Sequence, residues 1–345
     1  MIECPHISAP SARITSGVSW NDPRARAIAW QLVVVAVVVA IIATVAVQTA
    51  VNLRARGIAS GFEFLNRPAG FEIARGVLSF SSRDTYARAL LVGLLNTVRV
   101  SLLGVAIATS LGVVVGIARL SGIWIVSTVA RVYVEVTRNT PLLLQLLFWY
   151  TLTQGLPAPA AALNPLPGVY LCFRGLFLPA PTWHQGFPWI GVEEPTLVGF
   201  GFQGGTSISP EFAALLVGLS TYTAGFIGET IRGGILAVGR GQAEAAAALG
   251  LSRLHALRFV VLPQALRVII PPTTSQFLNL FKNSSLSVAI GYPDLMSITN
   301  TTLNQTGQAI EAIALAMAAY LAVSLSLSAG MNLFNRATLR RGRGA

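Results

Sequence analysis

Two long uncharged apolar runs constrain this chain more than any other feature. No charged residue lies between Arg26 and Arg54, and none lies between Glu311 and Arg336. A helix needs about 20 consecutive, mostly apolar residues to cross the hydrocarbon core of a bilayer. Both runs are longer than that, so they predict membrane-spanning helices.

The composition supports the same interpretation. Of the 345 residues, 53% are apolar and only 11% are charged, whereas a soluble domain carries about 25% charged residues. The net charge of +11 comes almost entirely from Arg in short segments between apolar runs. This pattern is typical of charges that orient a membrane protein and does not favour a nucleic-acid-binding surface. The two cysteines form no CxxC pair, so neither a disulfide scaffold nor a metal site is expected.

The apolar runs predict an all-α fold, a polytopic helical membrane protein with about six transmembrane helices. One N-terminal helix would precede a five-helix core. The third span is the weakest, because residues 119–140 contain four charges and Pro141 would start or kink a helix. In the second span, four small residues spaced by four predict a ridge where another helix packs closely: Gly104, Ala108, Gly112 and Gly116.

The segments between the spans can be assigned to one side of the membrane from their Lys and Arg content. Cytoplasmic segments would then hold 15 of the Lys and Arg residues and external ones seven, which agrees with the positive-inside rule except at loop 52–88. The predicted order is a cytoplasmic N-terminal segment 1–27, a helix 28–51, a periplasmic loop 52–88, a transmembrane domain 89–335 and a basic cytoplasmic tail 336–345.

Residues 155–210 are predicted to form a periplasmic loop inside the transmembrane domain. They contain nine of the 18 prolines, which cannot be accommodated in a spanning helix. The stretch 188–202 is apolar enough for a short re-entrant piece, so that alternative stays open at this point.

The segment 239–263 predicts a helix–turn–helix on the cytoplasmic surface. Residues 242–249 are rich in strong helix formers, with Glu244 expected in the first turn, where the macrodipole favours an anion. Gly250 fits the position just past a helix end, and Ser252 could cap a second short helix. Pro263 would then separate this hairpin from the fifth span.

The same segment carries a specific signature. Glu244-Ala245-Ala246, Gly250, Val260 and Leu262-Pro263 are spaced as in the pattern EAA-x3-G-x9-I-x-LP, with Val in place of Ile. It resembles the signature of the membrane subunits of type I ABC importers. Further motifs, at Arg138-Asn-Thr-Pro-Leu and Phe281-Lys-Asn-Ser-Ser-Leu, resemble the polar amino acid branch, and within it the Q-type permeases of general L-amino acid uptake systems.

The resemblance implies an importer permease that moves L-amino acids across a bacterial inner membrane by alternating access, with both termini in the cytoplasm. It implies three protein partners: an ATP-binding subunit, a sister permease and a periplasmic binding protein. The helix 243–256 would couple to the ATPase, and the implied coupling residues are Glu244, Ala245, Ala246, Gly250, Leu262 and Pro263. The sequence has no GxxxxGK[ST] phosphate loop, so ATP and Mg would bind the partner and this chain would be neither an enzyme nor a cofactor carrier.

Polar residues inside the predicted bundle are candidates for a substrate pathway, because such groups are costly in a membrane. They are Asn139, Gln145, Tyr222, Glu229, Lys282, Asn283 and Ser284. An amino acid offers a carboxylate and an ammonium, for which Lys282 and Glu229 are the matching charges. The alternative is that these residues form helix–helix hydrogen bonds or an internal ion pair. An ion-gradient-driven secondary carrier is the competing function, although it leaves the cytoplasmic hairpin unexplained.

Overall fold

The N-terminal unit consists of one exposed apolar helix. The computed structural model describes residues 23–55, 57, 60–73, 76–183 and 190–341, and the chain divides into two units, 1–60 and 61–345. In the first unit, α1 (Pro23–Ala55) has 33 residues, and its large apolar side chains are exposed throughout. At 1.5 Å per residue this helix is about 50 Å long, more than enough to cross a bilayer.

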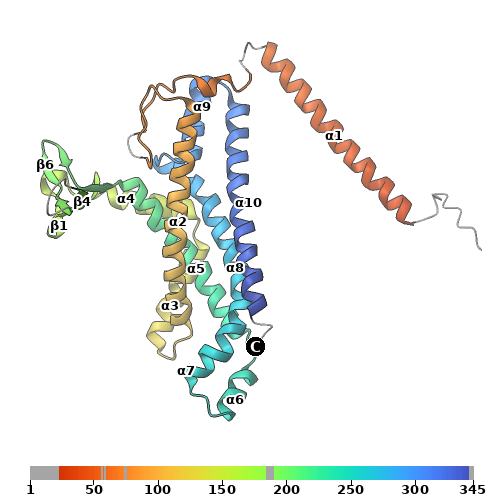
Figure 1. Cartoon of the computed structure of the whole chain (residues 1–345), viewed down its shortest axis with the longest axis vertical. Coiled ribbons are helices and arrows are strands. Elements are labelled where there is room, and N and C mark those ends of the chain that lie inside the picture. Colours follow the sequence, from red (N-terminus) through yellow and green to blue (C-terminus); the bar gives the residue numbers. More distant parts are fainter. Residues whose placement is uncertain (1–22, 56, 58–59, 74–75, 184–189, 342–345) are drawn as a thin grey trace, which may run out of the picture. The chain divides into compact units, whose positions relative to one another are not determined.

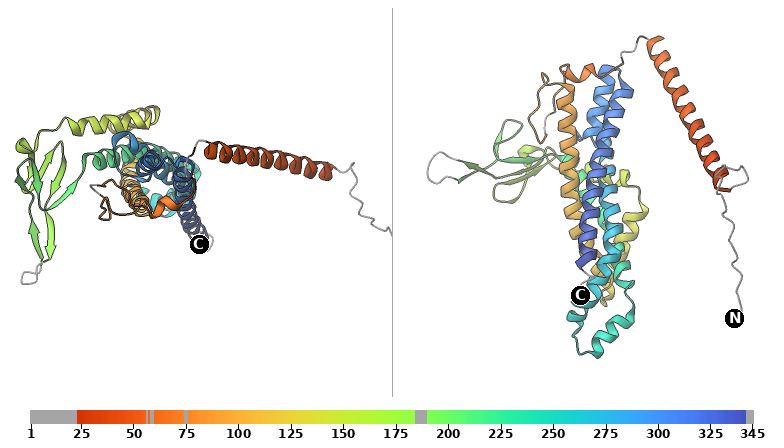
Figure 2. Two further views of the ribbon diagram at one scale, coloured as in Figure 1. Left: turned by 90° about the horizontal axis from the view of Figure 1, so that it is seen from above. Right: turned by 45° about the vertical axis from the view of Figure 1, so that its right-hand side comes forward.

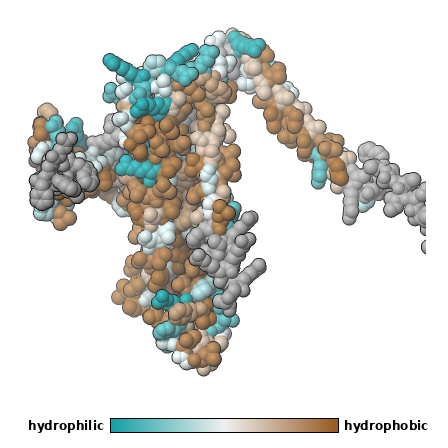
Figure 3. All heavy atoms as spheres, viewed as in Figure 1, coloured by the Kyte–Doolittle hydropathy of each residue, from teal (hydrophilic) through white to brown (hydrophobic). Residues whose placement is uncertain are grey.

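The second unit is a bundle of long helices. Its main members are α2 (Tyr86–Arg119), α5 (Pro210–Leu236), α8 (Leu262–Asn283) and α10 (Ala309–Arg341). They lie side by side in Figures 1 and 2, and apolar side chains cover most of the bundle surface in Figure 3. Among the described residues, five helices including α1 are long and apolar enough to span a membrane. The helical membrane fold is confirmed.

Capping residues explain where two of these helices begin. The Thr85 side chain accepts a hydrogen bond from the backbone N–H of Arg88 at the start of α2. Ser209 accepts one from the N–H of Phe212 at the start of α5, and Pro210 occupies the first turn of that helix. A proline in the first turn costs no hydrogen bond, because those N–H groups have no partner within the helix.

The small-residue ridge of α2 packs against α5, as predicted. All four members of the ridge are buried, and the closest contacts are made to Ile227 and Gly228 of α5. Neighbouring apolar side chains such as Val100, Leu219 and Leu280 complete the main core of the bundle. Small residues let the two backbones approach closely where lipid offers no hydrophobic driving force for helix association.

The predicted third span is broken into two helices. α3 (Trp124–Asn139) and α4 (Leu142–Gln154) are separated at Thr140 and Pro141, both of which have extended backbone conformations. The residue before a proline is disfavoured in the helical region, which accounts for the break at this position. Neither helix reaches the length of a spanning helix. Of the six long spans expected, the described residues therefore form five, and the broken pair α3–α4 takes the place of the sixth.

The fifth span begins earlier than predicted. Pro263 was expected to precede a helix starting near Ala265, but it lies in the first turn of α8. A π-helical turn, Leu257–Val261, connects α8 directly to the short helix α7 (Arg253–Ala256). The wider π turn accommodates the missing N–H of Pro263 without ending the helical run. A 3₁₀ segment, Ser284–Ile290, continues the run at the other end.

Within residues 155–210, the described stretches 155–183 and 190–210 form three small antiparallel sheets, which the sequence analysis did not anticipate. The strands are β1 (Leu163–Leu166), β2 (Val169–Cys172), β3 (Gly175–Leu178), β4 (Ala180–Trp183), β5 (Ile190–Glu193), β6 (Thr196–Val198), β7 (Gly201–Gln203) and β8 (Thr206–Ile208). Their orders are β1-β2-β3-β8, β4-β5 and β6-β7. The re-entrant alternative for 188–202 is wrong over its described part, because residues 190–203 form hairpin strands.

The remaining described elements are short. A 3₁₀ turn, Glu63–Asn66, precedes α2, and another, Pro159–Ala161, follows α4. The helix α9 (Leu295–Thr306) connects the 3₁₀ segment after α8 to α10. The tail predicted over 336–345 is not a separate segment up to Arg341, because α10 continues to that residue. Lys and Arg have good helix propensity, so charge alone did not end the helix.

Candidate functional site

The segment after α5 folds into a helical hairpin at one end of the bundle. α6 (Arg240–Ala248) is followed by Gly250 with φ of +78°. The N–H groups of Gly250 and Leu251 donate to the carbonyls of Ala247 and Ala246 at 2.9 and 3.1 Å, which closes the end of α6. The Ser252 side chain accepts from the N–H of His255 and caps α7. The predicted helix–turn–helix is therefore confirmed, and Figure 1 places it at the end of the bundle opposite α9.

The position of Glu244 differs from the prediction. α6 begins at Arg240, because the N–H of Gln242 already donates to the Gly239 carbonyl at 3.0 Å. Glu244 therefore lies in the middle of the helix and is exposed. It does not receive the macrodipole stabilisation expected for a first-turn anion, since that effect fades beyond one turn.

The hairpin presents apolar side chains to its surroundings. Leu249 is 82% exposed, Leu254 is 72% exposed and Phe259 is 62% exposed. Only small residues of the hairpin turn inward, with Ala246 and Ala256 buried where α6 packs against α7 and the π turn. A cluster of exposed large apolar residues on a well-formed element is typical of a protein-binding surface.

The break between α3 and α4 is bridged by Gln145. Its side-chain amide donates to the carbonyl oxygens of Thr137 and Thr140 at 2.9 and 3.1 Å. The break leaves these carbonyls without helical partners, and an unpaired backbone group in a membrane costs several kcal/mol. The role seen for Gln145 is thus to join the two helices. Asn139, the last residue of α3, is exposed.

Glu229 is engaged by two arginines. Arg119 at the end of α2 forms an ion pair with the Glu229 carboxylate. Arg232, one turn further along α5, contacts the other carboxylate oxygen at 2.7 Å. This is the internal ion pair that the sequence analysis named as the alternative to a substrate contact for Glu229.

The structure does not bring the seven candidate pathway residues together in one cavity. Lys282 is exposed and lines a cavity of about 480 Å³ beside α9 and α10, which none of the other six residues lines. The buried hydroxyl of Ser284 donates to the Phe281 carbonyl at 2.8 Å, and Asn283, beside it, ends α8. The Tyr222 ring packs on Phe226. Their part in transport remains a prediction.

A buried polar group that the sequence analysis missed lies at the start of α9. The Asp294 carboxylate is fully buried, accepts from the N–H of Ser297 at 2.8 Å and receives a hydrogen bond from the Tyr320 hydroxyl at 3.3 Å. Burial raises the pKa of Asp294 to about 6. Asp three residues before Ser297, at a helix start after Pro293, is a capping pattern that could have revealed it.

Thr97 and Asn96 extend this network into α2. The Thr97 hydroxyl oxygen accepts from the N–H of Leu295 at 3.0 Å, and the Asn96 amide donates to the Pro293 carbonyl at 2.9 Å. Both side chains are buried. The network therefore fixes the beginning of α9 against α2 and α10.

A polytopic bundle that carries an exposed helical hairpin between two of its spans has the architecture of a transport subunit. Comparison with known families agrees. Residues 108–343 match the family described as "Binding-protein-dependent transport system inner membrane component". This match covers more than half of the chain, and the chain belongs to that family.

Individual relatives extend the similarity to nearly the whole chain. The putative amino-acid ABC transporter permease protein YhdX of Escherichia coli (strain K12) is 42% identical, with 94% of this chain and 96% of the relative covered. The general L-amino acid transport system permease protein AapQ of Rhizobium johnstonii is 40% identical, with 92% of this chain and 95% of the relative covered. The chain is therefore a multi-pass inner-membrane permease subunit of the ABC class, and nothing in these relatives supports the secondary carrier.

One solved structure has a similar fold. The crystal structure of an amino acid ABC transporter with histidines includes a chain that is 27% identical to this one, with a TM-score of 0.53. The similarity covers 73% of this chain and 95% of that chain.

Proposed function

We propose that this permease moves L-amino acids into the cytoplasm after delivery by a periplasmic binding protein, through alternating access driven by a separate ATPase subunit. The proposal rests on the family, in which transport depends on a binding protein, and on relatives whose names specify amino acids. ATP and Mg would bind the ATPase subunit, because this sequence has no phosphate-binding loop. A sister permease would form the other half of the pore as a heterodimer.

The hairpin carries the coupling part of the proposal. The exposure of Leu249 and Leu254 on a well-capped hairpin is the observation that supports it most directly. In this arrangement Glu244, Ala245 and Ala246 contact the ATPase along α6. Gly250 forms the turn, and Leu262 and Pro263 begin α8 directly after the π turn. A movement of the hairpin is therefore transmitted to a long helix.

The orientation follows from the same assignment. If the hairpin meets an ATPase, it lies in the cytoplasm, and so do both chain termini. The strands of 155–210 then lie on the periplasmic side, where the binding protein delivers substrate. The remaining polar candidates, Asn139, Gln145, Tyr222, Glu229, Lys282, Asn283 and Ser284, would line or adjoin the pathway between these two sides.

A crosslinking experiment combined with uptake tests this function. The chain, with its partner subunits, is reconstituted in proteoliposomes, and Leu249→Cys carries a short thiol crosslinker. We expect a crosslink to the ATPase subunit and amino acid uptake that requires ATP. Phe200→Cys, at the tip of the β6-β7 hairpin and 90% exposed, is the matched control and should give no such crosslink. Uptake that persists without an ATPase subunit would contradict the proposal.

A further inference from the structure

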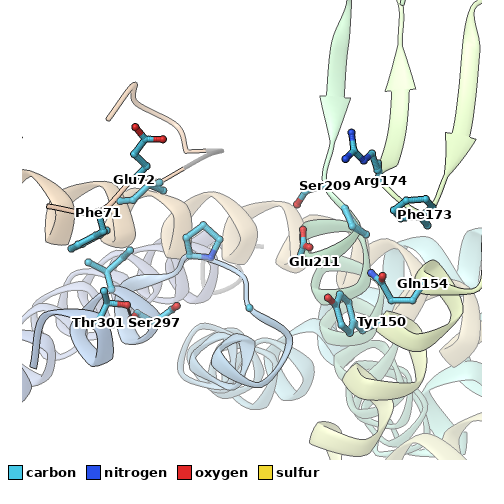
Figure 4. Close-up of a pocket in the computed structure, with 15 residues that line it drawn as sticks. Phe71, Glu72, Tyr150, Gln154, Phe173, Arg174, Ser209, Glu211, Ser297 and Thr301 are labelled. Atoms are coloured by element: carbon cyan, nitrogen blue, oxygen red, sulfur yellow. Dashed lines mark hydrogen bonds between the residues drawn. The ribbon is translucent and has the colours of Figure 1, made fainter. Parts of the chain in front are cut away.

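A cavity of about 660 Å³ lies at the N-terminal end of α5. Its lining comes from the end of α4, the turn between β2 and β3, the first turn of α5, the helix α9 and the segment 71–73 before α2 (Figure 4). In that last segment Glu72 is an exposed second carboxylate of the lining. None of the seven pathway candidates lines this cavity. It lies at the opposite end of α5 from the hairpin, because α5 runs without interruption from Pro210 to Leu236.

Glu211 supplies a negative charge to this cavity. It is in the first turn of α5, where the helix macrodipole favours an anion, and it is partly buried. Within the residues that the structure describes, no hydrogen bond or ion pair engages the Glu211 carboxylate or the hydroxyl of Tyr150 beside it. Partly buried polar groups without a partner are energetically costly and gain from a ligand that satisfies them.

Arg174 supplies the positive charge. Figure 4 shows it on the same side of the cavity as Ser209, Glu211, Tyr150 and Gln154. Its Nη1 donates to the Phe200 carbonyl at 3.0 Å, which fixes the guanidinium between the β6-β7 hairpin and the cavity. Arg174 makes interactions besides this bond. A guanidinium carries five N–H donors in a planar fork, so a carboxylate can share the fork with these contacts.

We propose that the cavity is a binding site for zwitterionic α-amino acids, in which Glu211 binds the ammonium group and Arg174 the carboxylate. The proposal rests on the proposed function, because it assigns a place on this chain where a substrate is received. The hydroxyls of Ser297 and Thr301 lie on the other side of the cavity in Figure 4. The side chain of the bound amino acid extends toward them.

Direct binding to the complex tests the site without the binding protein. The full chain with its partner subunits is placed in nanodiscs without ATP, and the Kd is measured by saturation-transfer NMR. The probes are L-glutamine, glutaramate, which lacks the ammonium, and 4-aminobutyramide, which lacks the carboxylate. We expect L-glutamine to bind at least ~10-fold more tightly than either analogue, since each analogue loses one charge-assisted contact.

Variants identify which residue binds the ammonium group and which binds the carboxylate. Glu211→Gln should remove the preference for L-glutamine over glutaramate, and Arg174→Gln should remove the preference over 4-aminobutyramide. Glu194→Gln changes an exposed carboxylate of the strand region outside the cavity and should leave all three Kd values unchanged. A residue that merely supports the fold would weaken the binding of all three probes by the same factor.

Two results overturn the proposal. One is equal weakening of all probes by Glu211→Gln, and the other is no saturation transfer from the wild-type complex to L-glutamine, L-glutamate or L-arginine. ATP-driven uptake by the same complex, reconstituted in proteoliposomes, separates this inference from the proposed function. Uptake that is intact beside either result disproves the cavity site alone, whereas loss of ATP dependence would disprove the proposed function.

Discussion

The turn of the helical hairpin depends on one residue. Gly250 has φ of +78°, and a Cβ at this position would meet no atom within 4 Å. Gly250→Ala should therefore act through backbone conformation alone, at about 1–2 kcal/mol, and should lower ATP-driven uptake while the protein still inserts and folds. Gly250→Asn is the matched variant, because Asn tolerates the left-handed region, and it should keep more uptake than Gly250→Ala. Equal loss in both variants would indicate that the partner packs against bare backbone.

Asp294 should make stability depend on pH. Its pKa is raised from 3.8 to about 6 in the folded protein, and it lies between candidate spans rather than within one. The folded state binds this proton more tightly, so the stabilisation is complete below pH 3.8 and is lost as the pH rises through about 6. The full effect is roughly 3 kcal/mol.

Thermal unfolding measures this dependence. We expect the melting temperature of the wild type, in detergent, to fall relative to that of Asp294→Asn between pH 4.5 and pH 7.5. Asn retains a cap for α9 and has no charge to bury, so other titrating groups cancel between the two proteins. Parallel melting curves across this pH range would show that the Asp294 carboxylate is not desolvated as the structure indicates.

At the residue scale, the sequence predicted the hairpin turn but not the buried acid. Gly250 and Ser252 have strong local signals, since each satisfies the backbone at a helix end. Glu244 was wrongly placed in the first turn because the helix was expected from residue 242 and begins two residues earlier, at Arg240. Asp294 escaped notice because its burial comes from α2 and α10, which are far away in the sequence.

At the element scale, the α2–α5 contact provides a test of close packing. A Cβ on Gly112 would lie 2.6 Å from Cγ2 and 2.7 Å from Cβ of Ile227. Gly112→Ala should therefore lower the unfolding free energy by about 1–3 kcal/mol through overpacking, even though Ala is the better helix former. Denaturant titration in mild detergent measures the change.

Gly233→Ala provides the control for this substitution. Gly233 lies in α5, and a Cβ there would meet nothing within 4 Å. Its replacement should leave the unfolding free energy unchanged or raise it by up to about 1 kcal/mol. Equal destabilisation by both substitutions would mean that helix flexibility, rather than close packing, determines the result.

The long elements could be predicted because apolar length is a strong local signal, and the exceptions have physical causes. The break at Pro141 was expected, but the continuous run through Pro263 was not, because the π turn that accommodates it has no sequence signature. The eight strands have three or four residues each. Strands this short are determined by pairing across the sheet, and the sequence shows no periodicity over so few residues.

At the scale of the whole molecule, the orientation can be tested with thiol reagents. The native Cys172 is fully buried in β2, so it would not report which side of the membrane it occupies, and Cys4 lies outside the described residues. With Cys4 replaced by Ser, an impermeant reagent added outside intact cells should label Phe200→Cys and should not label Leu254→Cys. Both positions are highly exposed in the structure.

Permeabilised cells provide the control, because both introduced cysteines should then react. Labelling of Leu254→Cys in intact cells would invert the assigned orientation and would remove the hairpin from the side where an ATPase works. The charge bias predicts the same orientation, but loop 52–88 weakens it with six arginines on the external side. The labelling experiment therefore determines the membrane orientation more directly than the charge distribution does.

The unbroken course of α5 has a mechanical consequence. Its 27 residues form a rod of about 40 Å at 1.5 Å per residue, held tightly to α2 near Ile227. A tilt of only about 5° around that point of contact displaces the far tip of such a rod by about 2 Å, which is enough to break a hydrogen bond. A small movement at the hairpin end of α5 would thus suffice to break contacts that a ligand makes at its N-terminal end.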